Sequence, residues 1–226
     1  MRLVLFDIDG TLITDGGAAR DAYAIALEAV YGYRGALRRY DFSGRTDPQI
    51  THMVLGDAGV SAEDIDAAMP RLWQHYLGAL ERSAHGRVRE LPGVRPLVET
   101  LAGDARVVLG LLTGNIEPGA RVKLGHAALN DFFPFGAFGS DSARREELPP
   151  IAVERASRLA GHRFEGRDVV IIGDSIYDIR CGVPHGATTI AIASGKTSAE
   201  TLLAENPDHF FASAEDHDAL RAAIIG

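Results

Sequence analysis

Four short apolar runs, separated by segments of helical periodicity, constrain the fold of this chain most strongly. The runs are Leu3–Phe6, Val107–Leu112, Val169–Ile172 and Thr188–Ala193. Each is rich in valine, isoleucine or leucine and is followed by polar or turn-forming residues, as expected for parallel strands buried on both faces. Helical patterns lie between them, at Val94–Leu101 and Pro150–Leu159. Alternating strands and helices predict an α/β fold, with an open parallel sheet between two layers of helices.

A long interval between the first and second apolar runs points to an inserted domain. It spans about a hundred residues, far more than one crossover connection needs. It contains no strand pattern but three amphipathic helical patterns, at Ala18–Val30, Asp47–Leu55 and Ala62–Leu80. Pro70 in the third pattern can divide it into two helices. We therefore expect a core formed by residues 1–14 and 87–226, with a helical domain inserted at residues 15–86.

The charge of the chain argues against a nucleic-acid partner. The formal net charge is −8, so the chain as a whole repels phosphate backbones. The short arginine pairs Arg38-Arg39 and Arg144-Arg145 are too small to form a basic patch. We therefore expect a small-molecule partner rather than a nucleic acid.

Cysteine usage and hydropathy predict a cytoplasmic protein without a membrane partner. Cys181 is the only cysteine, so no disulfide forms within the chain. No apolar run approaches the ~20 residues that a membrane-spanning helix needs. The run Leu3–Phe6 is too short for a signal-peptide core, because Asp7 ends it. A monomer and a homodimer are both compatible with the sequence.

Carboxylates follow the first and third apolar runs, at the edge where an open α/β sheet binds its ligands. Asp7 and Asp9 follow the first run, and Asp174 and Asp178 follow the third. If these strands are neighbours, the four side chains converge and repel one another unless a cation neutralises them. Mg²⁺ suits such a site because it prefers oxygen ligands and keeps several waters. We expect Asp7 and Asp174 as direct ligands, the backbone carbonyl of Asp9 as a third, and Asp178 as a holder of bound waters.

Three motifs at the strand ends resemble those of one enzyme superfamily. Asp7-Ile8-Asp9-Gly10-Thr11-Leu12 resembles the first motif of the haloacid dehalogenase-like (HAD) hydrolases. Thr113-Gly114-Asn115 resembles their second motif, and Gly173–Asp178 resembles their fourth. The resemblance covers nearly the whole chain, because the insert lies where the family carries its helical C1 cap. It implies a Rossmann-like three-layer core with an inserted C1 cap domain.

The resemblance implies a role for each residue of the first two motifs. Asp7 is the expected nucleophile, which forms an aspartyl-phosphate, and Asp9 is the expected general acid and base. The dehalogenases of the superfamily lack the second aspartate, so Asp9 disfavours a dehalogenase. The Thr113 hydroxyl, the Gly114 amide and the Asn115 side chain are expected to bind a phosphate oxygen.

The family's third motif, a lysine or arginine that bridges nucleophile and phosphate, departs here from its commonest form, a lysine before proline. In this half of the chain only Lys123 precedes the fourth motif, and it lies too close to the second motif. Arg145 has the spacing to Glu147-Leu148 that resembles a related subgroup. We expect Arg145 as the cation, with Arg144 as the alternative.

The segment Ser43–Asp47 is the most suggestive part of the insert. Gly44 allows a tight turn, and Arg45 beyond it can reach a substrate carboxylate in the cleft. The segment resembles one in phosphoglycolate phosphatase-like members. The alternative is that Asp47 pairs with Arg45 to shape the turn. Phosphonate-cleaving members use a cap lysine to form a Schiff base, and the insert contains no lysine, so that chemistry is disfavoured.

We therefore expect a Mg²⁺-dependent, C1-capped phosphatase that acts on a small phosphorylated metabolite such as phosphoglycolate. One alternative is a phosphomutase resembling β-phosphoglucomutase, which would share Asp7 and Asp9 but retain the sugar phosphate. Another is a phosphoryl-receiver or non-catalytic binding module, since receiver domains also cluster aspartates and magnesium on a parallel sheet. Receivers place the phosphoacceptor on a later strand and retain a lysine for the acyl phosphate, which disfavours this alternative.

Overall fold

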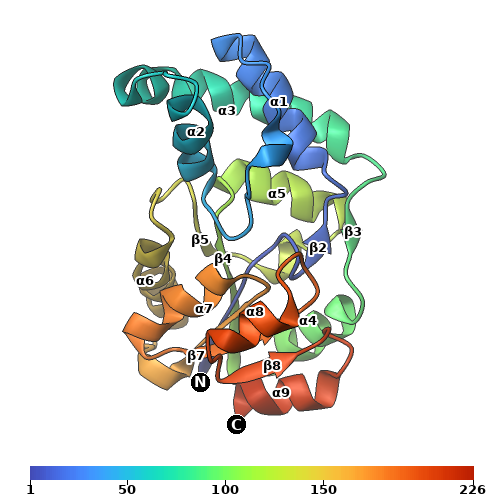
Figure 1. Cartoon of the computed structure of the whole chain (residues 1–226). Helices are drawn as coiled ribbons and strands as arrows, with labels where there is room; N and C mark the ends of the chain where they lie inside the picture. The colour runs from blue at the N-terminus through green and yellow to red at the C-terminus, as the bar shows by residue number, and fades with distance from the viewer.

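The computed structural model describes all 226 residues, and its centre is a six-stranded parallel sheet (Figure 1). The strands are β1 (Arg2–Phe6), β4 (Val107–Thr113), β5 (Gly136–Phe138), β6 (Val169–Gly173), β7 (Thr188–Ile192) and β8 (His209–Phe211). Their order is β5-β4-β1-β6-β7-β8, and every neighbouring pair is parallel. The four predicted apolar runs form the four central strands, which confirms the expected α/β fold. The sequence pattern misses the two edge strands, because three residues are too few to show a period.

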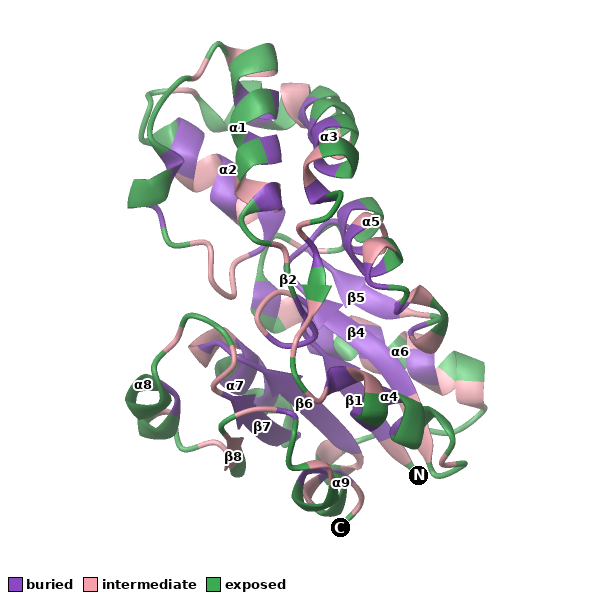
Figure 2. Ribbon diagram, turned by 90° about the vertical axis from the view of Figure 1, so that its right-hand side faces the viewer, coloured by how far each residue is buried: buried purple, intermediate pink, exposed green.

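Helices cover both faces of the sheet, and the alternating side chains of β1 show the division. Leu3 and Leu5 pack into an apolar cluster on one face, whereas Val4 and Phe6 pack into a larger cluster on the other. The first face is covered by α6 (Leu148–Ala160) and α7 (Ile176–Gly182), and the second by α4 (Val94–Ala102) and α9 (His217–Ile225). The central strands are therefore buried between two helical layers (Figure 2).

Three helices lie beyond the carboxyl edge of the sheet, at the top of Figure 1. They are α1 (Ala18–Tyr31), α2 (Asp47–Gly56) and α3 (Ala62–Ala84). The chain reaches them after β2 (Ile13–Thr14) and leaves them before β3 (Arg89–Glu90), and these two short strands pair antiparallel. All three helices fall within residues 15–86, and we continue to propose this segment as an inserted domain.

Helix α3 is continuous through Pro70, so the expected division of this segment is wrong. Proline removes one helical hydrogen bond and commonly bends or ends a helix. Here Pro70 lies on the exposed side, where water can bind the carbonyl that loses its partner. Ile65 before it and Leu72 and Tyr76 after it are buried, and their packing stabilises the helix on both sides of the proline.

Helix α5 (Glu117–His126) joins the helical segment to the sheet. It packs against α3 and lies directly beneath the three upper helices in Figure 1. One apolar cluster extends from Phe6 and Leu111 of the sheet to Tyr76 and Leu80 of α3.

The remaining elements are α8 (Ala199–Ala204) and 3₁₀ turns at Leu37–Arg39, Asn130–Phe132, Arg145–Glu147, Gly166–Asp168 and Val183–His185. None of the helices combines the length and the apolar character that crossing a membrane requires.

Candidate active site

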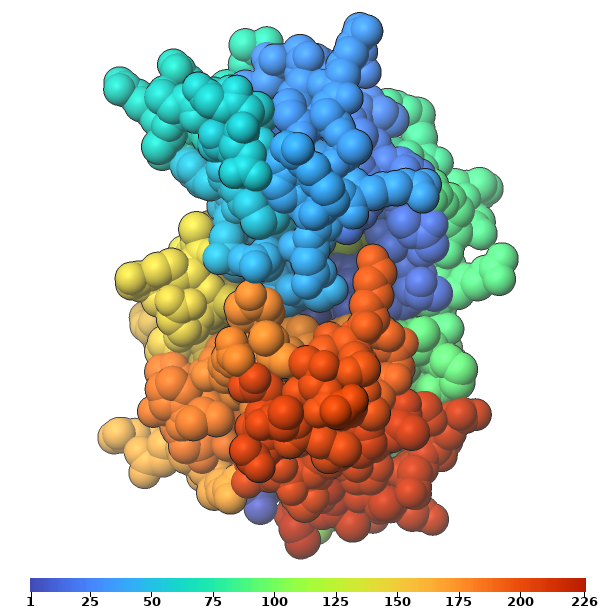
Figure 3. Space-filling view, viewed as in Figure 1, coloured from blue at the N-terminus to red at the C-terminus, as the bar shows by residue number.

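The carboxyl ends of the three central strands β4, β1 and β6 meet at one edge of the sheet. Phe6, the last residue of β1, pairs with Leu111 on one side and with Ile172 on the other. This register places Asp7, Thr113 and Asp174 side by side. All three line a cavity of about 330 Å³. In Figure 3 the molecule is hollowed between the blue and cyan helical segment and the orange core.

Three buried aspartates at this edge lie close together. Asp7, Asp174 and Asp178 each offer a carboxylate oxygen, and these oxygens lie within 4.8 Å of one another. Burial, followed by the charges of Asp7 and Asp178, raises the pKa of Asp174 well above its ordinary value. Thr11 holds Asp174 by donating from Oγ1 to its Oδ1 at 3.1 Å. Such a group of carboxylates is stable in its ionised form only if a cation is nearby.

The donor set fits a hard divalent cation, because the three side chains supply oxygen ligands only. Asp174 lines the cavity, and Gly195 packs so closely on its carboxylate that a Cβ there would overlap it. Asp178 is different, because protein groups already bind both of its oxygens. Ser175 donates to Oδ2 from its backbone N at 3.0 Å and from Oγ at 2.6 Å, while Arg145 pairs with Oδ1. The direct ligands that this geometry favours are therefore Asp7 and Asp174.

Arg145 is the buried cation of the site. Its side chain is 4% exposed, and its Nη2 lies 3.4 Å from Asp7 Oδ1 and pairs with Asp178. The same atom donates to the carbonyl of Leu112 at 3.2 Å. Burial opposes the charge, but Asp178 and Asp7 outweigh it and raise the pKa of Arg145. Its Nε is buried without a partner, which leaves one donor for an anionic ligand.

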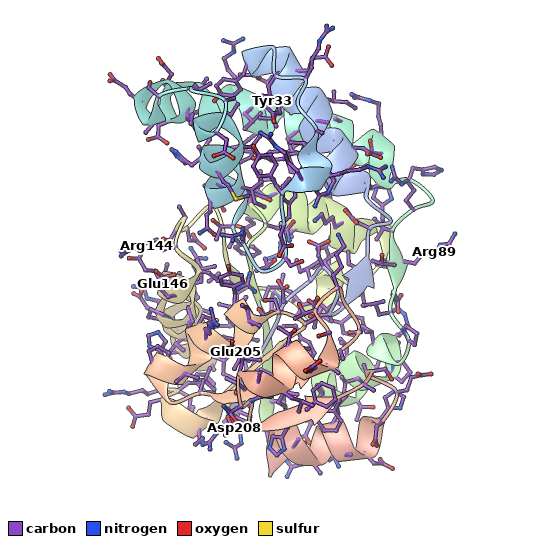
Figure 4. The ribbon with its side chains drawn as sticks, viewed as in Figure 1. Tyr33, Arg89, Arg144, Glu146, Glu205 and Asp208 are labelled. Carbon is purple, nitrogen blue, oxygen red and sulfur yellow. The ribbon has the colours of Figure 1, made fainter.

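Arg144, the alternative third-motif cation, lies elsewhere. Its side chain is 69% exposed and pairs with Glu147. In Figure 4 the labelled Arg144 and Glu146 point outward at the edge of the molecule. Of the two neighbouring arginines, only Arg145 lines the cavity.

The carboxylate of Asp9 lies apart from the other three aspartates, so the predicted convergence of four side chains is found for three of them. Its Oδ2 accepts hydrogen bonds from Asn115 Nδ2 at 2.8 Å and from Lys123 Nζ at 2.6 Å. Asn115 Nδ2 also donates to Thr113 Oγ1 at 2.9 Å. Both amide hydrogens of Asn115 are thus used within the protein, and the expected donation from this side chain to a phosphate stays a prediction.

Lys123 is a residue of the site that the sequence reasoning missed, because its spacing excluded it from the third motif. It lies on α5, its side chain is 3% exposed, and it lines the cavity. Burial alone would lower the pKa of Lys123, but Asp9, Asp15 and Asp47 outweigh it and raise the pKa. The helix pattern did contain a signal that Lys123 is buried. It lies on the same face of α5 as three small or apolar residues, and all four are buried: Gly119, Ala120, Lys123 and Leu124.

The loop before α2 rests directly on the second motif. Asp47 N donates to the carbonyl of Gly114 at 2.8 Å, and Ile116 N donates to Asp47 Oδ2 at 2.8 Å. A Cβ at Gly114 would overlap the carbonyl oxygen of Arg45, so glycine is needed here for contact with the loop. Burial raises the pKa of Asp47 to about 6, although Lys123 opposes the rise.

Arg45 does not pair with Asp47, so the expected alternative in which this pair shapes the turn is wrong. The Asp47 carboxylate accepts from Ile116 N instead. The half-buried Arg45 lines the cavity, and its guanidinium lies 5.4 Å from the centre of the Tyr177 ring. Its Nε is buried without a partner. Arg45 is therefore a further cation of the cavity, and its Nε is a donor that no protein group uses.

Three buried aspartates and a buried arginine at the carboxyl edge of a parallel sheet can hold a cation and an anionic ligand side by side. The family model for haloacid dehalogenase-like hydrolases matches residues 1–186. The chain belongs to this family, which confirms the resemblance seen in the motifs. Its membership in a hydrolase family also weighs against the phosphoryl-receiver and binding-module alternatives.

Relatives and solved structures agree with this assignment. Phosphoglycolate phosphatase of Pseudomonas putida is 26% identical over 232 residues, which cover 100% of this chain and 79% of that protein. The crystal structure of a hydrolase from Pseudomonas syringae superposes with a TM-score of 0.75 at 21% identity, covering 100% of both chains. A structure from Thermotoga maritima, provisionally assigned as a β-phosphoglucomutase, has a TM-score of 0.64 at 19% identity and covers 98% of this chain and 99% of that one. The two structures share the fold, and the sequence relative supports the phosphatase class.

Proposed function

We propose that this chain is a Mg²⁺-dependent phosphatase that hydrolyses a small phosphomonoester through an aspartyl-phosphate on Asp7. The observation that carries the proposal is the different surroundings of the two carboxylates in Asp7-Ile8-Asp9. Asp7 faces Arg145 and the aspartate cluster, whereas Asp9 is bound by Lys123 and Asn115. Two carboxylates held in different environments can take separate roles as nucleophile and as general acid and base.

The groups around Asp7 suit a nucleophile that attacks an anion. Asp7 and Asp174 are the residues that would hold Mg²⁺ directly, with the Asp9 carbonyl and Asp178 in the supporting roles expected from the sequence. The bound ion would neutralise charge on the phosphoryl oxygens. Arg145 contributes a fixed positive charge and a free Nε–H beside Asp7. The Thr113 hydroxyl and the Gly114 amide are the proposed contacts of a further phosphate oxygen.

The proposed reaction has two steps. First, a carboxylate oxygen of Asp7 bonds to phosphorus as the ester P–O bond breaks, and the leaving oxygen takes a proton from Asp9. A water oxygen then bonds to phosphorus and gives a proton to Asp9, while the bond between phosphorus and Asp7 breaks. Inorganic phosphate leaves, and both aspartates return to their starting states.

Arg45 and the size of the cavity support a small substrate that carries a second anionic group. A cavity of about 330 Å³ accommodates a phosphate and a few further atoms. The free Nε of Arg45 can bind a carboxylate by a charge-assisted hydrogen bond. Phosphoglycolate combines these features, and relatives bear the name phosphoglycolate phosphatase. We therefore propose phosphoglycolate or a similar short phosphocarboxylic acid as the substrate, and a cytoplasmic enzyme as expected from the sequence.

The test is release of inorganic phosphate from a panel of small phosphomonoesters, with and without Mg²⁺. Asp7→Asn should lower kcat by about 10⁴-fold or more, because it removes the nucleophile. Asp131→Asn, which changes an exposed carboxylate, is the matched control. Equal rates for wild type and Asp7→Asn would contradict the mechanism. Isomerisation of a sugar phosphate that strictly requires a bisphosphate activator would establish the mutase instead.

A further inference from the structure

The proposed reaction leaves one buried cation without a role. Lys123 Nζ lies 2.6 Å from Asp9 Oδ2 and 2.7 Å from Asn115 Oδ1. Asn115 in turn donates to the same Asp9 oxygen at 2.8 Å. The three side chains therefore form a closed triangle of hydrogen bonds. Such a triangle fixes the orientation of each member, because no side chain can rotate without breaking two bonds.

The triangle treats the two oxygens of Asp9 differently. Oδ2 accepts both donors, from Lys123 and from Asn115. Oδ1 is buried and has no partner in the protein. The Asp9 side chain is 38% exposed and lines the cavity beside Asp7, and its exposed part is not Oδ1. The two bonds to Oδ2 thus fix the orientation in which the carboxylate group meets a ligand in the cavity.

We propose that Lys123 is a positioning residue for the acid–base step: through its bond to Oδ2 it holds the Asp9 carboxylate in the orientation in which that group meets the leaving oxygen of the substrate. This inference rests on the proposed phosphatase function. When the ester P–O bond breaks, the proton moves from the Asp9 carboxyl group to the leaving oxygen. When water attacks the aspartyl-phosphate, a proton returns to Asp9. Lys123 keeps its own protons throughout and touches neither the phosphate nor the leaving group.

A purely structural role for Lys123 is the competing explanation. Helix α5 packs against α3, so a disturbed α5 could displace the helical segment and slow every substrate equally. The two explanations predict a different dependence of the hydrolysis rate on the leaving group of the ester. An alkoxide leaves only if it is protonated, so hydrolysis of an alkyl phosphate needs Asp9. The p-nitrophenolate ion is stable without a proton, so hydrolysis of p-nitrophenyl phosphate depends much less on general acid catalysis.

The experiment compares Lys123→Met with wild type on these two kinds of ester, in excess Mg²⁺. The quantity compared is kcat/KM, which reports only the steps up to departure of the leaving group and excludes the hydrolysis of the shared aspartyl-phosphate. We expect kcat/KM for the best alkyl phosphate of the panel to fall about 100-fold, near the lower end of the effect of general acid–base catalysis, and kcat/KM for p-nitrophenyl phosphate to change by less than about threefold. A parallel fall of kcat/KM for both esters, or no fall for either, would overturn the inference.

Two further variants complete the test. In an Asp9→Asn background, Lys123→Met should have almost no additional effect on the alkyl ester, since Lys123 acts only through Asp9. Lys196→Met removes the other lysine of the cavity, which does not contact Asp9, and should leave the ratio of the two rates unchanged. If Lys123→Met does not fold, Lys123→Arg, which keeps the charge but moves the donors, should shift the same ratio in the same direction.

The outcomes separate this inference from the proposed function. Wild-type enzyme that cleaves both esters, together with an unchanged ratio in the Lys123 variants, overturns the role of Lys123 alone. Wild-type enzyme that cleaves neither ester overturns the phosphatase proposal and this inference with it. Thermal unfolding of each variant, followed by circular dichroism, identifies any loss of rate that comes from loss of fold.

Discussion

The sheet edge and the loop before α2 bring their charged groups to the cavity in different ways. Asp7 and Asp174 directly follow β1 and β6, so the register of a parallel sheet places them. Arg45 lies on the loop before α2, and the backbone near the second motif holds this loop in place through hydrogen bonds to and from Asp47, the first residue of the helix. One side of the cavity is thus built into the core, and the other depends on a contact between two segments.

This difference suits the two sides of the cavity to different tasks, contact with the phosphate and selection of the substrate. Residues placed by the sheet cannot move without disturbing the core, which suits groups that must meet the phosphate in a fixed geometry. A loop held by a few hydrogen bonds can differ in sequence and position without loss of the fold, which suits groups that select a substrate. Changes at the sheet edge should therefore affect every substrate, whereas changes in the loop should affect substrate choice and stability.

The largest expected effect concerns the sheet edge. Removal of divalent cations with EDTA should lower kcat by about 10³-fold or more for all substrates alike, because a bound cation supplies several kcal/mol of charge stabilisation. Phosphate release measured during titration with Mg²⁺ should recover fully, and Asp174→Asn should need a higher Mg²⁺ concentration. Full activity after exhaustive chelation would remove the proposed metal from the mechanism.

The next effect concerns the contact that holds the loop. The pKa of Asp47 is raised to about 6 in the folded protein from 3.8, so the folded state holds its proton more tightly than the unfolded chain. The resulting stability is present below pH ~4 and is lost as pH rises to about 6, a change of about 3 kcal/mol. Asp47→Asn does not titrate, and its amide oxygen can still accept from Ile116 N.

Urea unfolding should therefore show similar stability for Asp47→Asn and wild type at pH 4, and a more stable variant at pH 7. Asp131→Asn, an exposed change, controls for the effect of net charge. A constant difference between Asp47→Asn and wild type across this pH range would show that the Asp47 carboxylate does not oppose folding.

A smaller effect should appear in substrate choice. Arg45→Ala should lower kcat/KM for a phosphomonoester that carries a carboxylate by about 10- to 100-fold, the size of one charge-assisted hydrogen bond. An ester of similar size without a carboxylate should change much less. The exposed Arg144→Ala is the control. An equal fall in kcat/KM for both esters would mean that Arg45 shapes the loop and does not bind the carboxylate of the substrate.

The smallest effect should come from Gly114→Ala. The added methyl group overlaps the carbonyl of Arg45, so the loop must move away from the second motif. We expect KM to rise about tenfold with a smaller change in kcat, since overpacking costs about 1–3 kcal/mol and the loop can yield. Gly56→Ala, at a glycine with open space around it, is the matched control. A larger fall in kcat than rise in KM would show that the methyl group disturbs the proposed phosphate contact of the Gly114 amide more than it displaces the loop.

The residues at the strand ends could be placed from the sequence more easily than the side chains that contact them. Asp7, Thr113 and Asp174 required only that three buried runs be neighbouring parallel strands, and the sheet order confirms this. The sequence favoured Arg145 over Arg144 only by a resemblance in spacing, because a turn of the backbone decides which of two adjacent side chains is buried. Lys123 was rejected on its spacing, because motif spacing says nothing about a residue that reaches the site from a helix.

The sequence by itself determined the class of fold, the edge of the sheet at which the aspartates gather and the family of the enzyme. It could do so because strand patterns and motifs are local, and parallel strands have only one carboxyl edge. Only the tertiary structure decided that Lys123 contacts Asp9 across 114 residues and that Asp47 contacts Ile116 across 69. Such contacts depend on how helices and loops pack in space, and a local pattern of residues cannot predict which residues far apart in the sequence will meet.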